Sequence, residues 1–308
     1  SDRDSHHVLY LNLTFIYSQP LLRLRQKEFS MLFDTHLHLI YPDRLDYPWL
    51  KSVPALNAPS TFNSYSVKAK RLGITECLHM EVDVDPKQID LENELITELM
   101  REPDSILRGA ISAARPENSD FSQFVEAAQH NKTIKGFRRV LHTQKDEMSQ
   151  STAFRNNIRT LSNTGLTFDL CVLPHQLLIA TELVDYCPQV IFILNHCGVP
   201  DIKNGNFSPW NDFISALAKR PNVIAKISGL IAYGDPETWN LDSIRPYFDH
   251  TVEAFGHSRI IWGSDSPVCN LGGGLETWVA STHALTADWS LDQRRCFYQG
   301  NAKNIWAV

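Results

Sequence analysis

The sequence predicts an α/β fold, a (β/α)8 TIM barrel that forms a single domain, and three observations favour it. Eight short runs rich in Ile, Val, Leu and Phe recur from residue 31 onward, as expected of parallel strands that are buried on both faces. Amphipathic stretches with helical spacing separate these runs. No Pro-, Gly- or Ser-rich linker divides this part of the chain, and about 270 residues suit one closed barrel.

The eight expected strands are short and follow one another at regular intervals. In chain order they span residues 31–36, 74–82, 106–110, 134–138, 167–172, 190–195, 223–227 and 259–262. In a barrel of this kind the carboxyl ends of all strands meet at one rim, where the active site is built. Residues at and just after the end of each run are therefore the candidates for chemistry.

Apolar stripes between the strands predict the helices that cover the barrel. The stripes are Leu91, Leu95 and Leu99; Phe121, Phe124, Val125 and Ala128; and Trp210, Phe213, Ile214 and Leu217. Ser290 and Gln293 have the spacing of a capping box, so we expect them to open the last helix.

One connection, residues 40–65, is unusually long and follows the first strand. It holds Tyr41, Tyr47 and Trp49 together with four prolines, so we expect a stiff, aromatic loop at the rim where substrate binds. A packed surface loop would have the same composition. The sequence leaves both interpretations open, with Trp49 as the candidate substrate contact.

The composition is that of an ordinary globular protein, with 43% hydrophobic and 21% charged residues among 308. A net charge of −6 without a cluster of Lys and Arg argues against a nucleic-acid partner. The absence of a run of about 18 apolar residues argues against a membrane partner. Six scattered cysteines without a Cys-x-x-Cys pair indicate free thiols and a cytoplasmic setting. The sequence leaves open whether the chain forms a homo-oligomer.

Residues 1–30 differ from the rest of the chain. A polar stretch precedes an apolar one that Asn12, Ser18, Pro20 and Arg23 interrupt, and the segment lacks the basic region and cleavage site of a secretory signal. Because the first expected strand begins at Met31, we interpret residues 1–30 as an N-terminal extension and residues 31–308 as the barrel. An arm packed on the barrel is the alternative.

A His-x-His pair near the start of the barrel is matched by a carboxylate near its end. His36 and His38 lie two residues apart, so on a strand they project to the same side. Asp265 follows the apolar run 259–262 and would lie at the end of the last strand. Two imidazoles and a carboxylate at one rim indicate a hydrolytic centre, with or without a metal.

Further ionisable side chains follow the other strands. They are His79 and Glu81, Arg138 and Arg139, Asp169, His196, and Lys226. Buried ionisable groups are unfavourable unless they are paired or used. Because alternate strand residues face opposite ways, Arg138 rather than Arg139 is expected to face the site. Lys226 either contacts substrate or forms an ion pair inside the barrel.

Seven motifs in unbroken order carry a resemblance to a known family. They are Asp34-Thr35-His36-Leu37-His38, Tyr47-Pro48-Trp49-Leu50, Lys135-Gly136-Phe137-Arg138, Asn195-His196-Cys197-Gly198-Val199-Pro200, Lys226-Ile227-Ser228-Gly229-Leu230, Trp262-Gly263-Ser264-Asp265-Ser266-Pro267-Val268 and Gly300-Asn301-Ala302. The chain resembles the amidohydrolase superfamily, in particular its amidohydrolase 2 branch of sugar-lactone and 2-pyrone-4,6-dicarboxylate lactone hydrolases. The resemblance implies a distorted TIM barrel that hydrolyses lactones or other esters.

The resemblance also implies roles for four residues. Asp265 would deprotonate the attacking water. His36, His38 and His196 would orient the substrate or, together with Asp265, hold one divalent metal, Zn or Mn. Catalysis without a metal is the alternative. A two-metal site is not expected, because strand four offers arginine and strand five ends without a histidine.

Four further residues are candidate substrate contacts. Arg138 would fix a carboxylate or hydroxyl, since its planar fork suits such groups. Glu81, Trp49 and Lys226 complete this set. Together the residues predict a hydrolase that opens a small carboxylated or polyhydroxylated lactone. The alternative is a metal-dependent decarboxylase or hydratase of a small carboxylic acid on the same scaffold, and a non-catalytic small-molecule binder is the third hypothesis.

Overall fold

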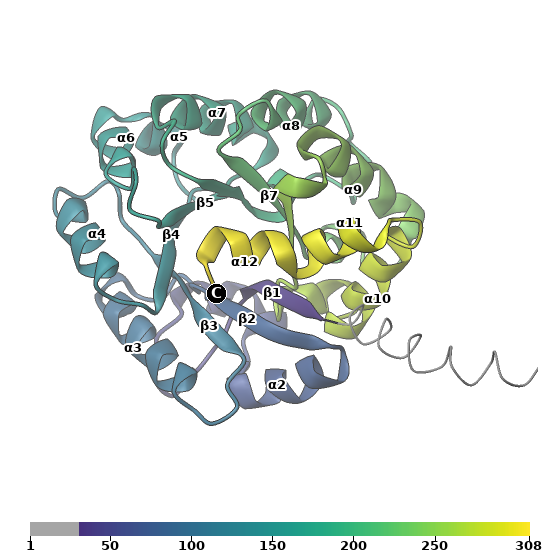
Figure 1. Ribbon diagram of the computed structural model, residues 1–308, viewed down its shortest axis with the longest axis horizontal. Coiled ribbons are helices and arrows are strands. Elements are labelled where there is room, and N and C mark those ends of the chain that lie inside the picture. The colour runs from purple at the N-terminus through teal and green to yellow at the C-terminus, as the bar shows by residue number, and fades with distance from the viewer. Residues whose placement is uncertain (1–30) are drawn as a thin grey trace, which may run out of the picture.

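The computed structural model describes residues 31–308 as one barrel of eight parallel strands with helices between them (Figure 1). In order around the barrel the strands are β1 Leu32–Leu37, β2 Ile74–Met80, β3 Leu107–Ala113, β4 Ile134–Val140, β5 Thr167–Cys171, β6 Phe192–Leu194, β7 Val223–Ser228 and β8 Ile260–Gly263. All eight predicted strands are confirmed, although their boundaries shift by up to three residues. The predicted extension, residues 1–30, lies outside the described residues.

The backbone that follows β8 closes the barrel against β1. The amide of Asp265 donates to the carbonyl of His36 at 2.8 Å, and the amide of His38 donates to the carbonyl of Ser266 at 2.8 Å. The hydroxyl of Thr35 also donates to the carbonyl of Trp262 at 2.7 Å. These bonds bring the His-x-His pair and the Gly-Ser-Asp segment to one place on the rim, as the sequence predicts.

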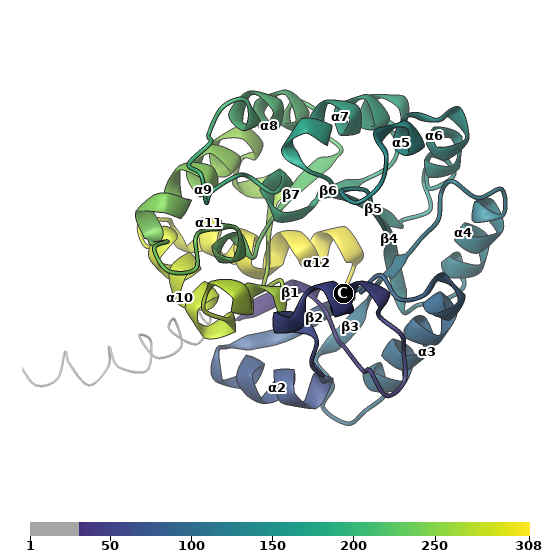
Figure 2. The same cartoon turned by 180° about the vertical axis from the view of Figure 1, so that it is seen from behind.

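Helices surround the barrel (Figures 1 and 2). They are α2 Phe62–Arg71, α3 Ile89–Met100, α4 Phe121–Gln129, α5 Asp146–Gln150, α6 Thr152–Arg159, α7 Leu177–Tyr186, α8 Trp210–Ala218, α9 Leu241–Phe255, α10 Leu275–Leu285, α11 Leu291–Arg295 and α12 Asn301–Trp306. The predicted capping box of Ser290 and Gln293 is confirmed, but it opens α11 and not the last helix, α12. Within residues 31–308 we find no helix with the length and apolar character needed to cross a membrane.

The predicted stripe on α3 is partly wrong. Leu95 and Leu99 are buried, but Leu91 is 48% exposed. The buried face of α3 instead runs through Ile89, Glu92, Leu95, Ile96 and Leu99. At 100° per residue, Leu91 lies about 100° round the helix from the centre of that face. A strict four-residue spacing therefore drifts off the face that packs on the sheet.

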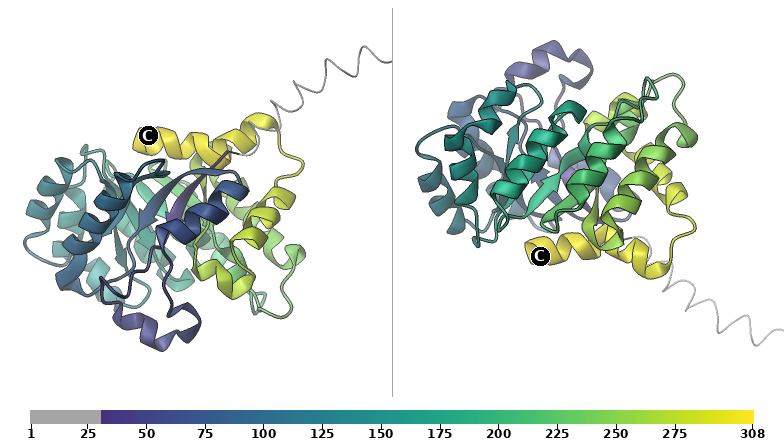
Figure 3. Two further views of the ribbon diagram at one scale, coloured as in Figure 1. Left: turned by 90° about the horizontal axis from the view of Figure 1, so that it is seen from below. Right: turned by 90° about the horizontal axis from the view of Figure 1, so that it is seen from above.

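The last helix, α12, lies across the amino-terminal opening of the barrel (Figures 1 and 3). Trp306 at its end packs with side chains from inside the barrel, among them Phe33, Leu78 and Ile261. Its indole nitrogen also donates to the hydroxyl of Thr167 at 3.3 Å. Because this end is filled, a ligand must approach from the opposite rim, at the carboxyl ends of the strands.

The long connection after β1 lies at that opposite rim (Figures 2 and 3). It contains two short 3₁₀ helices, Pro48–Ser52 and Pro54–Leu56. Trp49 is half-buried, and its indole nitrogen donates to the carbonyl of Val82 at 2.7 Å, just beyond β2. This bond fixes the loop beside the end of β2, while substrate contact by Trp49 stays a prediction.

Candidate active site

Asp34 fastens the end of β1 to the segment that follows β8. One carboxylate oxygen accepts the amide of Ser264 at 2.7 Å and the amide of His36 at 3.1 Å. The other oxygen accepts the hydroxyl of Tyr65, from α2, at 2.7 Å. Both oxygens are therefore occupied by structural bonds, and Asp34 positions the catalytic candidates without facing the reaction space.

An unusual backbone conformation at Asp265 orients its side chain. Its φ of 57° lies in the left-handed region, which residues with a Cβ rarely adopt. Gly229, after β7, also has a positive φ of 58°, and a Cβ placed there would lie 2.6 Å from Asp265 Oδ2. Glycine at 229 is thus required both by the backbone and by the space that the carboxylate fills.

Three polar atoms from β1 and the β8 end converge on one point. The Nε2 atoms of His36 and His38 lie 3.2 Å apart. Asp265 Oδ1 lies 3.6 Å from Nε2 of His36 and 3.4 Å from Nε2 of His38. All three side chains are buried. The sequence placed these three residues together, and the structure shows them in contact.

The hydrogen-bond partners of the two histidines favour an acceptor role for all three of these atoms. His38 Nδ1 lies 3.0 Å from the carbonyl of Met80 and 3.1 Å from that of Glu81, so Nδ1 carries the proton and Nε2 a lone pair. Arg138 Nη1 lies 3.4 Å from His36 Nε2 and can only donate, so that atom also offers a lone pair.

Three buried acceptors facing one point require a shared cation or proton. Within residues 31–308, His36, His38 and Asp265 are also the group whose ligand atoms lie close enough together to hold a metal ion. Two imidazoles and one carboxylate suit a divalent transition metal. The residues therefore fit the single-metal expectation. His196, which completed the predicted ligand set, is not part of this group.

His196 faces the other side of the Asp265 carboxylate. It follows β6 in a left-handed turn with a φ of 51°, and its Nδ1 lies 3.6 Å from Asp265 Oδ2. The same Nδ1 lies 2.9 Å from the hydroxyl oxygen of Ser228 at the end of β7. Its ring packs against that of Tyr233 with centroids 5.8 Å apart. His196 is thus held by β7 and lies near the second carboxylate oxygen of Asp265, with its ring centroid 4.5 Å from that of His36.

Burial sets the protonation states of this cluster. Desolvation raises the pKa of Asp265 to about 6, although the charges of His196 and Arg138 oppose the rise. Desolvation, helped by the positive charge of Arg138, lowers the pKa of His38 to about 3. Burial likewise lowers the pKa of His196 to about 4, against the pull of Asp265. Near neutral pH the site therefore contains neutral imidazoles beside an ionised carboxylate.

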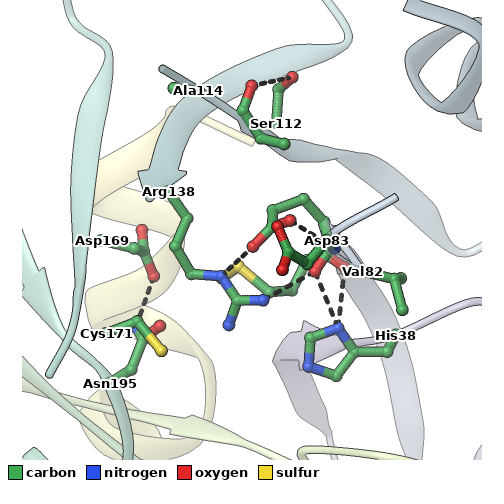
Figure 4. Close-up of polar contacts among 12 residues, drawn as sticks. His38, Val82, Asp83, Ser112, Ala114, Arg138, Asp169, Cys171 and Asn195 are labelled. Carbon is green, nitrogen blue, oxygen red and sulfur yellow. Dashed lines mark hydrogen bonds and ion pairs between the residues drawn. The ribbon is translucent and has the colours of Figure 1, made fainter. Parts of the chain in front are cut away.

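Arg138 and Glu81, predicted as separate substrate contacts, form a buried ion pair. Arg138 Nε donates to Glu81 Oε1 at 2.5 Å, and Nη2 donates to the backbone carbonyl of Glu81 at 2.8 Å. Figure 4 shows Arg138 reaching from β4 toward His38, with Asp169 and Cys171 on its other side. The predicted choice of Arg138 over Arg139 agrees with the structure, because Arg139 pairs with Glu117 away from this cluster.

Lys226 adopts the second of its two predicted arrangements. It is fully buried, and its ammonium lies 2.8 Å from Asp169 Oδ2. The same oxygen accepts the side-chain amide of Asn195 at 2.7 Å (Figure 4). This ion pair lies inside the barrel, so Lys226 acts on the site through its charge.

Two residues of the site were missed by sequence reasoning. Ser228 was noticed only as part of a motif, since its bond to His196 depends on the register between β6 and β7. Tyr233 lies in the 3₁₀ turn Leu230–Tyr233, and no spacing rule predicts that this turn folds back over His196.

A family model described as Amidohydrolase matches residues 33–308. The chain belongs to the amidohydrolase family. The match spans the whole barrel from β1 to α12, and it identifies the protein as an enzyme of the hydrolase class.

Relatives of this amidohydrolase include proteins with and without a named activity. An uncharacterised protein of Sinorhizobium fredii is 25% identical over 295 residues, which cover 90% of this chain and 98% of that protein. An L-fucono-1,5-lactonase of Burkholderia ambifaria is 36% identical over 147 residues, which cover 46% of this chain and 50% of the lactonase. A crystal structure of a Burkholderia multivorans amidohydrolase with bound Zn matches with a TM-score of 0.81 at 20% identity, over 91% of this chain and 100% of that chain. This last likeness supports the barrel fold.

Proposed function

We propose that this amidohydrolase opens a small carboxylated or polyhydroxylated lactone with a water molecule that Asp265 deprotonates. The observation that carries the proposal is the buried contact between the Asp265 carboxylate and three imidazoles at the open rim of the barrel. The similarity to an L-fucono-1,5-lactonase supports a lactone as the substrate.

The reaction follows from the protonation states of the site. With a pKa of about 6, Asp265 is ionised at neutral pH and is more basic than an exposed aspartate. It takes a proton from water as the water oxygen bonds to the lactone carbonyl carbon. The ring C–O bond then breaks, and Asp265 returns the proton to the departing alkoxide. The product is a hydroxy acid, which ionises and acidifies the solution.

The negative oxygen of the tetrahedral intermediate needs donors that are already in place. Arg138 Nη1 faces the imidazole cluster, 3.4 Å from His36 Nε2, and can donate there. Burial raises the pKa of Tyr233 well above its usual value, so its hydroxyl stays protonated beside His196. We propose these two groups as the stabilising donors.

One divalent metal, Zn or Mn, would be held by His36, His38 and Asp265, and when bound it would polarise the carbonyl and acidify the water. Without it, Arg138 and Tyr233 would polarise the carbonyl alone. Chelation with a metal assay on the purified protein separates the two cases. Full activity at negligible metal content excludes metal catalysis.

The proposed activity is tested with a pH-indicator screen over sugar lactones and over pyrone and muconate lactones. We expect acid release that depends on the enzyme for at least one lactone. The three-residue metal group would also serve a metal-dependent decarboxylase or hydratase, so carbon dioxide is measured in parallel on small aromatic and unsaturated acids. If the enzyme releases carbon dioxide, or hydrates an acid without hydrolysing any lactone, the proposed lactonase activity is wrong and the decarboxylase or hydratase takes its place.

A further inference from the structure

We propose that Glu81 determines whether the site accepts a charged or an uncharged substrate. By neutralising Arg138, it makes the site select lactones that carry no carboxylate. This inference rests on the proposed lactonase function and narrows it, because the sequence alone leaves carboxylated and polyhydroxylated lactones open. The contacts of Glu81, the partners of the other cations at the rim and the position of Arg138 support it.

The contacts of Glu81 pair its carboxylate with the guanidinium of Arg138. Its Oε1 accepts Arg138 Nε at 2.5 Å, and its Oε2 accepts the amide of Asp83 at 2.7 Å. Both side chains are at least 94% buried, so the pair is poorly screened by solvent.

Arg138 is the cation best placed to meet a substrate. Its Nη1 faces the cluster of His36, His38 and Asp265, 3.4 Å from His36 Nε2. A free guanidinium there would bind a carboxylate through two parallel hydrogen bonds. Its Nε and Nη2 are instead committed to the side chain and the backbone of Glu81. A hydroxyl can still accept from Nη1, whereas a carboxylate finds no unpaired positive charge on Arg138.

Three other cations near the strand ends also have acid partners. The pairs, with their N–O distances, are Arg115–Asp83 at 3.4 Å, Arg139–Glu117 at 2.8 Å and Lys226–Asp169 at 2.8 Å. Asp265 adds a negative charge that has no lysine or arginine of its own. In the metal-free enzyme a carboxylated lactone would therefore bring its charge next to a carboxylate, and such repulsion is an effective source of specificity.

The test uses two lactones that differ in one group, D-glucono-1,4-lactone and D-glucaro-1,4-lactone, in which a carboxylate replaces the terminal hydroxymethyl. We expect the wild-type enzyme to favour the uncharged lactone in kcat/KM by about tenfold or more. Glu81→Gln keeps the size of the side chain and removes its charge. It should shift that ratio toward the carboxylated lactone by about tenfold or more, mainly through a lower KM.

Two further variants separate charge from structure. Glu81→Asp keeps the charge and should keep the wild-type preference. Glu117→Gln removes the acid partner of Arg139, which lies away from the imidazole cluster, and should leave the ratio unchanged. Thermal melts confirm that each variant is folded. If Glu81→Gln does not fold, the wild-type ratio of kcat/KM for the two lactones decides whether the proposed role of Glu81 stands.

The outcomes of this test are distinguishable. Equal or better wild-type turnover of the carboxylated lactone overturns the role of Glu81 and leaves the lactonase function standing. An unchanged ratio in a folded Glu81→Gln variant does the same. If neither these lactones nor any member of the screen is hydrolysed, the lactonase function falls and the role of Glu81 falls with it.

Discussion

At the scale of single residues, the site depends on side chains that hold the histidines in one orientation. Ser228 is the clearest case, because its hydroxyl oxygen lies 2.9 Å from His196 Nδ1. Partners of this kind fix the tautomer and the ring orientation of a histidine. Ser228→Ala is expected to lower kcat about 10- to 100-fold without a large change in thermal stability.

The chain offers a matched control for that prediction. Ser215 Oγ lies 3.1 Å from His250 Nε2, a serine–histidine contact between α8 and α9. Ser215→Ala should leave kcat unchanged when both variants are assayed on the same lactone. Equal activity of Ser228→Ala and the wild type would show that His196 needs no partner from β7.

At the scale of elements, the close approach of the β7 and β8 ends positions the general base. A Cβ at Gly229 would lie 2.6 Å from Asp265 Oδ2, and the backbone there has a φ of 58°. Gly229→Ala should therefore displace Asp265 and lower kcat by more than about tenfold, since small displacements of reacting groups reduce rates strongly. The left-handed backbone should add about 1 to 2 kcal/mol of destabilisation.

Gly205 provides the control at this scale. It has a φ of 67°, but a Cβ there would meet nothing within 4 Å. Gly205→Ala should share the backbone destabilisation and keep full activity. Denaturant unfolding and kcat are measured for both variants. Equal kcat values for the two alanine variants would contradict the claim that this packing aims Asp265.

The same elements show what the sequence can and cannot predict. Strands and their order follow from apolar runs, and parallel strands share a rim, so His36, His38 and Asp265 were predicted to meet. The Arg138–Glu81 pair was not predicted, because the two residues lie 57 positions apart, Glu81 just beyond β2 and Arg138 on β4. Tyr233 was missed because a 3₁₀ turn, rather than a periodic element, places it. Leu91 was assigned to the wrong face because four-residue spacing approximates the helical period poorly.

At the scale of the whole molecule, the buried histidines of the site make the free energy of unfolding depend on pH. The pKa of His36 lies well below its usual value, those of His38 and His196 lie near 3 and 4, and that of Asp265 lies near 6. The stabilising contribution of each neutral histidine is present above about pH 6.5 and is lost as the pH falls toward its folded pKa. Asp265 has the opposite sign, because its raised pKa destabilises the fold above about pH 6.

Below pH 6 the three histidines outweigh the one carboxylate. Each group changes the free energy of unfolding by about 1.4 kcal/mol per pH unit. His38 and His196, less Asp265, should therefore remove about 1.4 kcal/mol per unit between pH 6 and pH 4, and the lowered pKa of His36 adds to this loss. Urea unfolding of the metal-free protein over this range measures the slope. His196→Gln should reduce the slope by about 1.4 kcal/mol per pH unit, the effect of one proton. Equal slopes for the wild type and His196→Gln would show that His196 does not titrate as proposed.

The central claim is that Asp265 activates the attacking water, and the kcat of Asp265→Asn on a lactone identified in the screen tests it most directly. Measured at pH 8, where the wild-type carboxylate is ionised, kcat should fall by about 10² to 10⁴ while the thermal melt stays cooperative. A folded Asp265→Asn enzyme with wild-type kcat would contradict the account.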